Sequence, residues 1–179
     1  KDEIGVISFD WGGGGSRWDF PLSEKGDGTA VYDAIKRMKV GDMPSFEDSM
    51  NVALNGKGGS PGLAQSDAKQ KHVIIISDGD PQRPSQALID QYKAAKVTVS
   101  TVSVYPHGNT VPPQMQQIAN DLKGKYYGPI NSNFNQLPQI FIKEASVVRR
   151  SLIQENAEGI PLKQIPSTSD MVKGIESFP

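Results

Sequence analysis

The sequence predicts an α/β fold, a doubly wound and mostly parallel sheet flanked by helices. Segments with a strand pattern alternate along the chain with segments of helical periodicity, which is the order that builds such sheets through right-handed crossovers. The most apolar segment, residues 73–76, is aliphatic at every position. Because side chains alternate between the two faces of a strand, this pattern indicates a strand in the middle of a sheet, covered by helices on both sides.

The amino-terminal region reads as a β-hairpin. Residues 4–9 are rich in β-branched and aromatic side chains, and residues 18–22 alternate like a second strand, with Pro21 favouring an edge position. A glycine-rich loop, residues 12–15, joins them. Such a loop cradles phosphate only when it opens into a helix. Here a strand follows, so we interpret the loop as a flexible hairpin connection.

Two helices are predicted next. The first begins near Asp27, with Val31, Ile35 and Met38 on one face and Gly41 where it ends. The second begins after Ser45, whose sequence Ser-Phe-Glu-Asp resembles a capping box with Asp48 in the place of Glu. Its apolar face consists of Phe46, Met50, Ala53 and Leu54.

The rest of the chain continues the alternation of strands and helices. Strands are expected over residues 72–77, 97–104 and 125–127. One helix begins at Pro84-Ser85 with Leu88 and Tyr92 on one side, and another opens at Pro112-Pro113 with an apolar face of Met115, Ile118, Ala119 and Leu122. A long last helix from Pro138 places Phe141, Ala145, Val148 and Leu152 on one face.

Composition narrows the classes of function. Lys and Arg number 19 against 20 Asp and Glu, a net charge of -1, so there is no basic excess to neutralise nucleic-acid phosphates. No apolar run approaches the roughly 20 residues that cross a bilayer, so this segment is expected to be soluble and not to span a membrane. The absence of cysteine excludes disulfides and thiol catalysis and leaves the compartment open.

Candidate site residues follow from the predicted sheet. Ligands of open α/β sheets bind beyond the carboxyl ends of the strands, where the loops converge. An oxygen-rich set there, Asp78, Ser45 and Asp80, suits Mg²⁺ or Ca²⁺ better than zinc. We expect partner contacts from four further positions in these loops: Asp10, Trp11, Asp42 and His107. Simpler readings stay open, since Asp78-Gly79 is also a strand-ending turn, Ser45 a helix cap and His107 a surface residue.

Residues 74–80, Ile-Ile-Ile-Ser-Asp-Gly-Asp, resemble the strand and Asp-Gly turn of a von Willebrand factor A domain. The resemblance implies a metal-ion-dependent adhesion site built from an Asp-x-Ser-x-Ser loop, a Thr and the Asp of this turn, here Asp78. Pro44 stands at the Thr position with Ser45 beside it, and no Asp-x-Ser-x-Ser occurs in the chain. The resemblance therefore implies a degenerate metal site.

The same resemblance shapes the expected domain organisation. It covers residues 1–155 as a partial domain, because the family's first strand and first helix would precede Lys1. Residues 156–179 are expected to be a linker toward an absent domain. Several stretches also resemble bacterial membrane-associated proteins that carry a glutamine-amidotransferase-like domain, which implies a membrane-anchored parent protein. The open sheet left by a missing strand suggests a strand-exchanged homodimer.

Catalysis has little support in the sequence. There is no cysteine, no Ser-His-Asp arrangement that a strand-end elbow would support and no pair of His residues at i, i+4, so we predict no catalytic residue. The favoured function is a non-enzymatic protein-interaction module with a degenerate or absent divalent-metal site. The alternative is a fragment of a Mg²⁺- or Ca²⁺-dependent hydrolase whose other ligands lie upstream.

Overall fold

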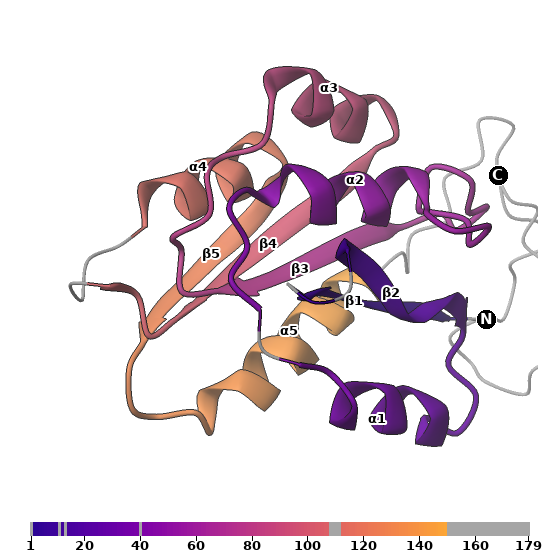
Figure 1. Ribbon diagram of the computed structural model, residues 1–179, viewed down its shortest axis with the longest axis horizontal. Helices are drawn as coiled ribbons and strands as arrows, with labels where there is room; N and C mark the ends of the chain where they lie inside the picture. The colour runs from indigo at the N-terminus through magenta and orange to yellow at the C-terminus, as the bar shows by residue number, and fades with distance from the viewer. Residues whose placement is uncertain (1, 11, 13, 40, 108–111, 150–179) are drawn as a thin grey trace, which may run out of the picture. The chain divides into compact units, whose positions relative to one another are not determined.

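The structure is a computed structural model that describes residues 2–10, 12, 14–39, 41–107 and 112–149 (Figure 1). These residues lie within one compact unit, Lys1–Arg149. The predicted linker, residues 156–179, lies outside the described residues, so its assignment stays a prediction.

The order of the elements agrees with the prediction. Along the chain they are β1 Glu3–Asp10, β2 Gly15–Glu24, α1 Thr29–Lys36, α2 Phe46–Asn55, β3 Lys71–Ser77, α3 Gln86–Ala94, β4 Val97–Val104, α4 Pro113–Asp121, β5 Lys123–Ile130 and α5 Gln136–Arg149. The hairpin of β1 and β2 is confirmed as an antiparallel pair. Strand β5 is longer than the three residues predicted for it.

The strands form two separate sheets. β3, β4 and β5 make a three-stranded parallel sheet in that order, and β1 and β2 make a two-stranded sheet of their own. This corrects one prediction, because β3 lies at an edge of its sheet and β4 lies in the middle. The aliphatic run of β3 is only partly buried, and the side chain of Ile76 is 52% exposed.

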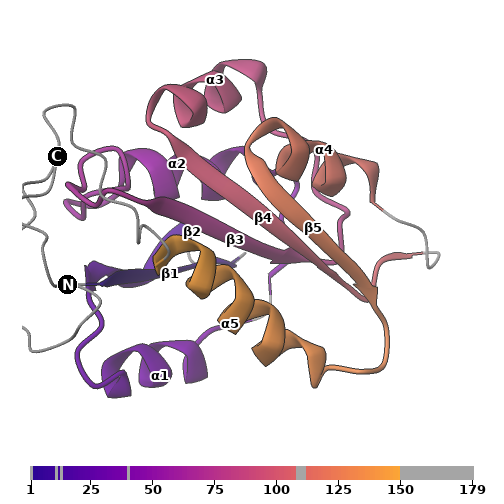
Figure 2. The ribbon, with the colours of Figure 1, turned by 180° about the vertical axis from the view of Figure 1, so that it is seen from behind.

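Helices cover both faces of the three-stranded sheet. α2, α3 and α4 lie on one side and α5 lies on the other, while α1 packs against the hairpin of β1 and β2 (Figures 1 and 2). The larger core is on the first side, where apolar side chains of α2, α3 and α4 pack on β4; its fully buried members include Phe46, Ile89, Tyr92, Val99 and Met115. The core beneath α5 is smaller and centres on Val102, Ile130 and Ile140.

Serine caps fix the starts of two helices. Ser45 Oγ accepts a hydrogen bond from the Glu47 amide, and Ser85 Oγ accepts from the Leu88 amide. The predicted capping box does not form in full, since the Asp48 carboxylate accepts from the Ser16 amide at 2.7 Å. Asp48 therefore ties α2 to the start of β2.

Helix α1 differs from its prediction. It ends at Lys36 rather than at Gly41, and its buried residues are Val31 and Ala34, whereas Ile35 and Met38 are exposed. Gly41 lies against β1 instead, where a Cβ atom would stand 2.2 Å from the Phe9 carbonyl oxygen. Gly41 therefore lets the chain approach the backbone of β1 closely, and it does not terminate α1.

Helix α5 also turns a different face inward. Ile140 and Glu144 are buried, while Phe141 and Ala145 are exposed. The apolar periodicity predicted the wrong buried face of α5, because the buried face contains the carboxylate of Glu144 and is not uniformly apolar. The side chain of Val148 and the residue Leu152 lie outside the described part of the chain.

Candidate functional site

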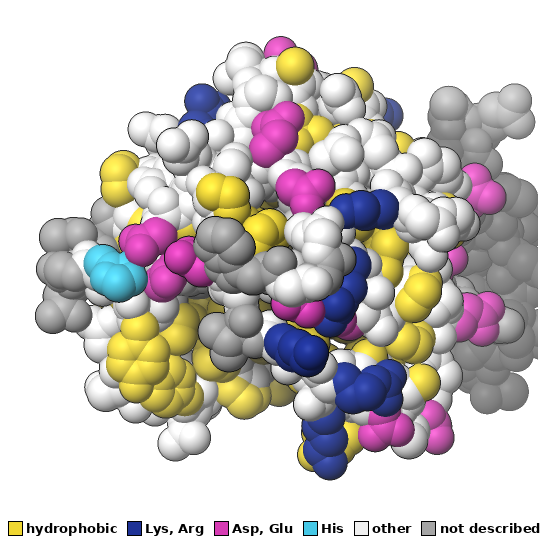
Figure 3. Space-filling view, viewed as in Figure 1, with side chains coloured by type: hydrophobic (Ala, Val, Ile, Leu, Met, Phe, Trp, Pro, Cys, Tyr) yellow, Lys and Arg dark blue, Asp and Glu magenta, His cyan; other side chains and the backbone are white. Residues whose placement is uncertain are grey.

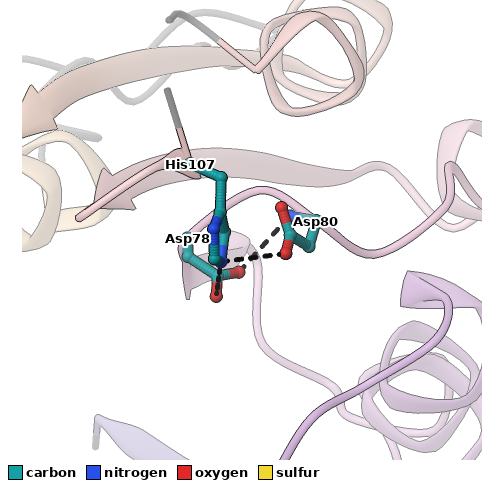
Figure 4. A group of neighbouring side chains, drawn as sticks. All are labelled: Asp78, Asp80 and His107. Atoms are coloured by element: carbon teal, nitrogen blue, oxygen red, sulfur yellow. Dashed lines mark hydrogen bonds and ion pairs between the residues drawn. The ribbon is translucent and has the colours of Figure 1, made fainter. Parts of the chain in front are cut away.

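Three side chains meet beyond the carboxyl ends of β3 and β4 (Figure 4). His107 Nε2 lies 3.1 Å from Asp80 Oδ2 and 3.9 Å from Asp78 Oδ2. One ligand atom from each residue lies within 4.8 Å of the others. Figure 3 shows acidic side chains gathered beside a histidine at one edge of the molecular surface. We call these three residues the rim cluster.

The backbone after β3 holds the two acidic residues in place. Asp78 Oδ1 accepts from the Asp80 amide at 3.3 Å and from the Ser77 hydroxyl at 3.2 Å, which closes a tight turn. Gly79 has φ +93, and a Cβ there would stand 2.3 Å from Pro112 Cγ. Only glycine fits this position. The turn is thus fixed against the start of α4, and its carboxylates are aimed outward.

His107 arrives from a separate loop. It follows β4, the strand beside β3, and the parallel pairing aligns Ser77 with Ser103 so that both strands end at the same edge. The sequence placed all three rim-cluster residues at this edge. From the sequence we assigned Asp78 and Asp80 to a metal site and His107 to partner binding. In the structure His107 lies next to both aspartates.

The donor set fits a hard cation only in part. Carboxylate oxygens are the ligands that Mg²⁺ and Ca²⁺ prefer, whereas an imidazole is a softer ligand that these ions seldom use. Ca²⁺ takes six to eight oxygen ligands. The rim cluster offers two exposed carboxylates, one of which faces His107 at 3.1 Å. Asp78 and Asp80 could hold a hydrated Mg²⁺ or Ca²⁺, with water supplying most of the coordination shell.

Ser45, the third predicted metal residue, has its hydroxyl engaged elsewhere. Ser45 Oγ accepts from the Glu47 amide at 3.1 Å and donates to the Gln82 carbonyl at 3.4 Å. Two backbone hydrogen bonds join the loop before α2 to the segment after the Asp-Gly turn. The Phe46 amide donates to the Gln82 carbonyl, and the Gln82 amide donates to the Pro44 carbonyl. Ser45 thus acts as a helix cap in this structure, and its role toward a metal stays a prediction.

The other predicted partner-binding residues have different surroundings. Asp10 is buried and lies 3.1 Å from Arg17, and it accepts from the Gly12 amide at 2.9 Å, so its carboxylate is used inside the hairpin. Asp42 is exposed and lines a cavity together with Asp78. Trp11 lies outside the described residues.

Sequence reasoning missed a buried polar network at the opposite end of β3. The Glu144 carboxylate accepts from the Ser100 hydroxyl at 2.6 Å and from the Tyr127 hydroxyl, and His72 Nε2 lies 3.0 Å from it. His72 Nδ1 contacts Thr98 Oγ1 at 2.7 Å. The Thr98 hydroxyl also donates to the Lys71 carbonyl at 3.3 Å. We call His72, Ser100, Tyr127 and Glu144 the buried network.

Burial and hydrogen bonding set the protonation of this network. Burial lowers the pKa of His72, and the nearby Glu144 only partly opposes this. Burial alone would raise the pKa of Glu144, but hydrogen bonds from Ser100 and Tyr127 and the charges of His72 and Lys125 lower it overall. Burial, together with Glu144, raises the pKa of Tyr127 to about 12. These shifts favour an ionised Glu144 and a neutral Tyr127, and the network fastens α5 to the sheet.

Comparisons with known proteins found one family and two solved structures to report. The family model for the von Willebrand factor type A domain matches residues 1–143. The solved structure of the conserved hypothetical protein BatB from Bacteroides thetaiotaomicron is similar, with a TM-score of 0.57 and 19% identity over 84% of this chain and 80% of that chain. A membrane-spanning protein from Vibrio fischeri matches with a TM-score of 0.33 and 15% identity over 82% of this chain and 76% of that one. None of the curated proteins matches.

The chain belongs to the von Willebrand factor type A domain family. The parallel sheet with helices on both faces is the α/β arrangement that the sequence predicted. Domains of this family are generally protein-interaction modules, and they commonly bind Mg²⁺ or Ca²⁺. Among the described residues, no helix has the length and apolar character that a membrane span needs.

Proposed function

We propose that this domain is a non-enzymatic protein-interaction module whose recognition surface includes the rim cluster. The observation that carries the proposal is the convergence of three exposed polar side chains from two loops at one sheet edge. The side chains of Asp78, Asp80 and His107 are 45%, 52% and 74% exposed. Exposed ion pairs add little to stability, so a partner can replace these contacts at little cost to the fold.

The metal site in this proposal is degenerate. Asp78 and Asp80 supply two carboxylates, whereas the Ser45 hydroxyl is hydrogen-bonded to the Glu47 amide and to the Gln82 carbonyl. So few protein ligands hold a hydrated cation weakly. Binding of the protein partner is then independent of Mg²⁺ and Ca²⁺.

A thermal-shift experiment tests the metal part of the proposal. In 5 mM MgCl₂ or CaCl₂ the melting temperature should stay within about 1 °C of its value in EDTA. A site with a dissociation constant near 1 mM would instead add about 1 kcal/mol, which is a rise of about 2–4 °C for a domain of this size. A rise of that size that is lost in Asp78→Ala would overturn the degenerate site.

Affinity capture tests the recognition surface. A partner identified with the wild-type domain should lose most of its binding to Asp78→Ala/Asp80→Ala, and it should bind equally in EDTA. The matched control is Asp90→Ala, which removes an exposed aspartate of α3 that lies 3.8 Å from Lys93. Equal binding to all three proteins would contradict the proposal. Hydrolysis of phosphate or amide substrates that Asp78→Ala abolishes would favour the metal-dependent hydrolase instead.

A further inference from the structure

Two aromatic side chains lie exposed on the loops that follow β4 and β5. Tyr105 comes directly after β4 and is 60% exposed, and Phe134, between β5 and α5, is 38% exposed. Their ring centroids lie 5.2 Å apart, with an angle of 47° between the ring planes. Burial of such rings is favourable, so a pair of them left at the surface is typical of a contact surface. We call Tyr105 and Phe134 the aromatic pair.

The backbone holds Tyr105 in this exposed position. Its amide donates to the Ile130 carbonyl at 3.1 Å, which fastens the loop after β4 to the end of β5. Tyr105 has φ +50, in the left-handed region that bulky residues seldom occupy. The ring is therefore presented to solvent from an anchored backbone and not from a free loop end.

The aromatic pair borders the rim cluster. β3, β4 and β5 are parallel, so the loops that follow them meet at one edge of the sheet. Tyr105 lies two residues before His107, and Figure 3 shows a hydrophobic patch directly below the histidine and the acidic side chains. Among the described residues no Lys or Arg forms an ion pair with Asp78 or Asp80. This edge therefore combines exposed aromatic rings with two carboxylates.

Arginine is the side chain that fits this combination best. Its guanidinium group is planar, stacks on aromatic rings and can donate two parallel hydrogen bonds to a carboxylate. Another exposed tyrosine of this chain already has a cation over its ring, since Lys36 Nζ lies 4.4 Å from the Tyr32 centroid. No Lys or Arg from the described part of the chain lies over either ring of the aromatic pair. A cation from a partner can take that place.

We propose that the aromatic pair and the two rim-cluster carboxylates bind an arginine side chain of the protein partner. The rings supply the stacking surface, and Asp78 and Asp80 accept the guanidinium hydrogen bonds. The proposal rests on the proposed function, because it names the chemistry of the partner that the same edge recognises. No metal is needed for this contact, since the carboxylates bind the cation of the partner directly. Lysine fits less well, because its ammonium group is a compact point charge that does not stack.

Matched peptides test the proposal with the domain as it stands. The four probes are acetyl-Gly-Leu-Xaa-Leu-Gly-amide with arginine, citrulline, lysine or glutamate at Xaa, titrated in EDTA into the ¹⁵N-labelled domain and followed by nuclear magnetic resonance. We expect the arginine peptide to shift the amides of residues 78–80 and 105. It should bind at least about fivefold more tightly than the citrulline peptide, which has a similar shape and no charge. The lysine peptide should bind more weakly than the arginine peptide, and the glutamate peptide should not bind.

Protein variants assign the contacts. Asp78→Asn/Asp80→Asn keeps the shape of both side chains and removes their charge, so the arginine peptide should lose about tenfold in affinity. Tyr105→Leu keeps an apolar side chain and removes the ring, which should weaken binding of the same peptide about threefold. The matched controls are Asp90→Asn on α3 and Tyr32→Leu on α1, which replace exposed residues of the same types and should leave the affinity unchanged.

Three outcomes would overturn the proposal. Equal affinities for the arginine and citrulline peptides would show that no cation is recognised. The absence of shifts with the arginine peptide at about 10 mM would mean that this edge does not bind the side chain. Binding of the glutamate peptide in MgCl₂ but not in EDTA, without binding of the arginine peptide, would assign the edge to an acidic ligand bridged by a metal.

The proposed function fails by a different result. If the captured partner binds Asp78→Ala/Asp80→Ala as well as it binds the wild type, the rim cluster is not the recognition surface. If that variant loses the partner while the arginine and citrulline peptides bind equally, the recognition surface stands and only the arginine is wrong.

Discussion

The two ends of β3 carry the same chemistry in opposite surroundings. At its start, His72 lies 3.0 Å from Glu144, with side chains 9% and 3% exposed. Beyond its end, His107 lies 3.1 Å from Asp80, with side chains 74% and 52% exposed. The two contacts between imidazole and carboxylate are therefore not equivalent, because a buried contact stabilises the fold far more than one exposed to solvent.

The largest effect is expected at the buried end. Glu144→Ala removes a carboxylate that accepts hydrogen bonds from Ser100 and Tyr127, and it leaves the buried Ser100 hydroxyl, the partly buried Tyr127 hydroxyl and His72 without this partner. We expect a loss of about 3 kcal/mol in the free energy of unfolding, measured with urea. Glu144→Gln, which keeps the volume, should cost less. A loss below about 1 kcal/mol for the alanine variant would show that the network does not stabilise the fold.

A smaller loss is expected at Ser100. Its hydroxyl donates to Glu144 at 2.6 Å and accepts from the Lys125 amide at 3.0 Å, in a fully buried position. Ser100→Ala should cost about 1–2 kcal/mol, because the amide and the carboxylate each lose one bond. The same urea titration measures it. An additive loss in the Ser100→Ala/Glu144→Ala double variant would indicate that the two residues act separately.

The buried end should also respond to pH. Burial holds the pKa of His72 below its ordinary value of 6.5, so below that pH the unfolded chain takes up a proton more readily than the folded one. The lowered pKa of Glu144 acts in the same direction at lower pH. Stability should therefore be greatest above pH 6.5 and fall as the pH falls from there.

Urea midpoints at pH 7.5 and 5.5 measure this dependence. His72→Gln should flatten the decline, and His107→Gln should leave it as in the wild type. The groups facing His72 are Glu144 and Lys125, and neither titrates ordinarily between these two pH values. A midpoint that rises on acidification would mean that the charged imidazole stabilises the fold.

The smallest effect on stability is expected at the exposed end. Asp80→Ala removes the carboxylate nearest to His107, and the free energy of unfolding should change by less than about 0.5 kcal/mol. A change above about 1 kcal/mol would indicate that the rim cluster is part of the scaffold.

Local signals explain which parts of the fold could be predicted. The order of strands and helices, the cap at Ser45 and the inward face of α4 depend on residues close together in sequence, and the structure agrees with each of them. The rim cluster was found because parallel strands end at one sheet edge, which needs only the approximate ends of β3 and β4.

Long-range contacts explain what could not be predicted. The edge position of β3 depends on which strands pair, and no local pattern encodes that. The inward face of α5 was misassigned because Glu144 is buried only through partners on β3, β4 and β5. A carboxylate in a helix normally marks the solvent side, so its burial could not be inferred from periodicity.

Double-mutant cycles on the two histidine–carboxylate contacts test this account most directly. One cycle combines His72→Gln with Glu144→Ala, and the other combines His107→Gln with Asp80→Ala, all measured by urea unfolding at pH 7. We predict a coupling energy of about 1.5 kcal/mol or more for the first pair and less than about 0.5 kcal/mol for the second. Equal coupling energies for the two pairs would contradict it.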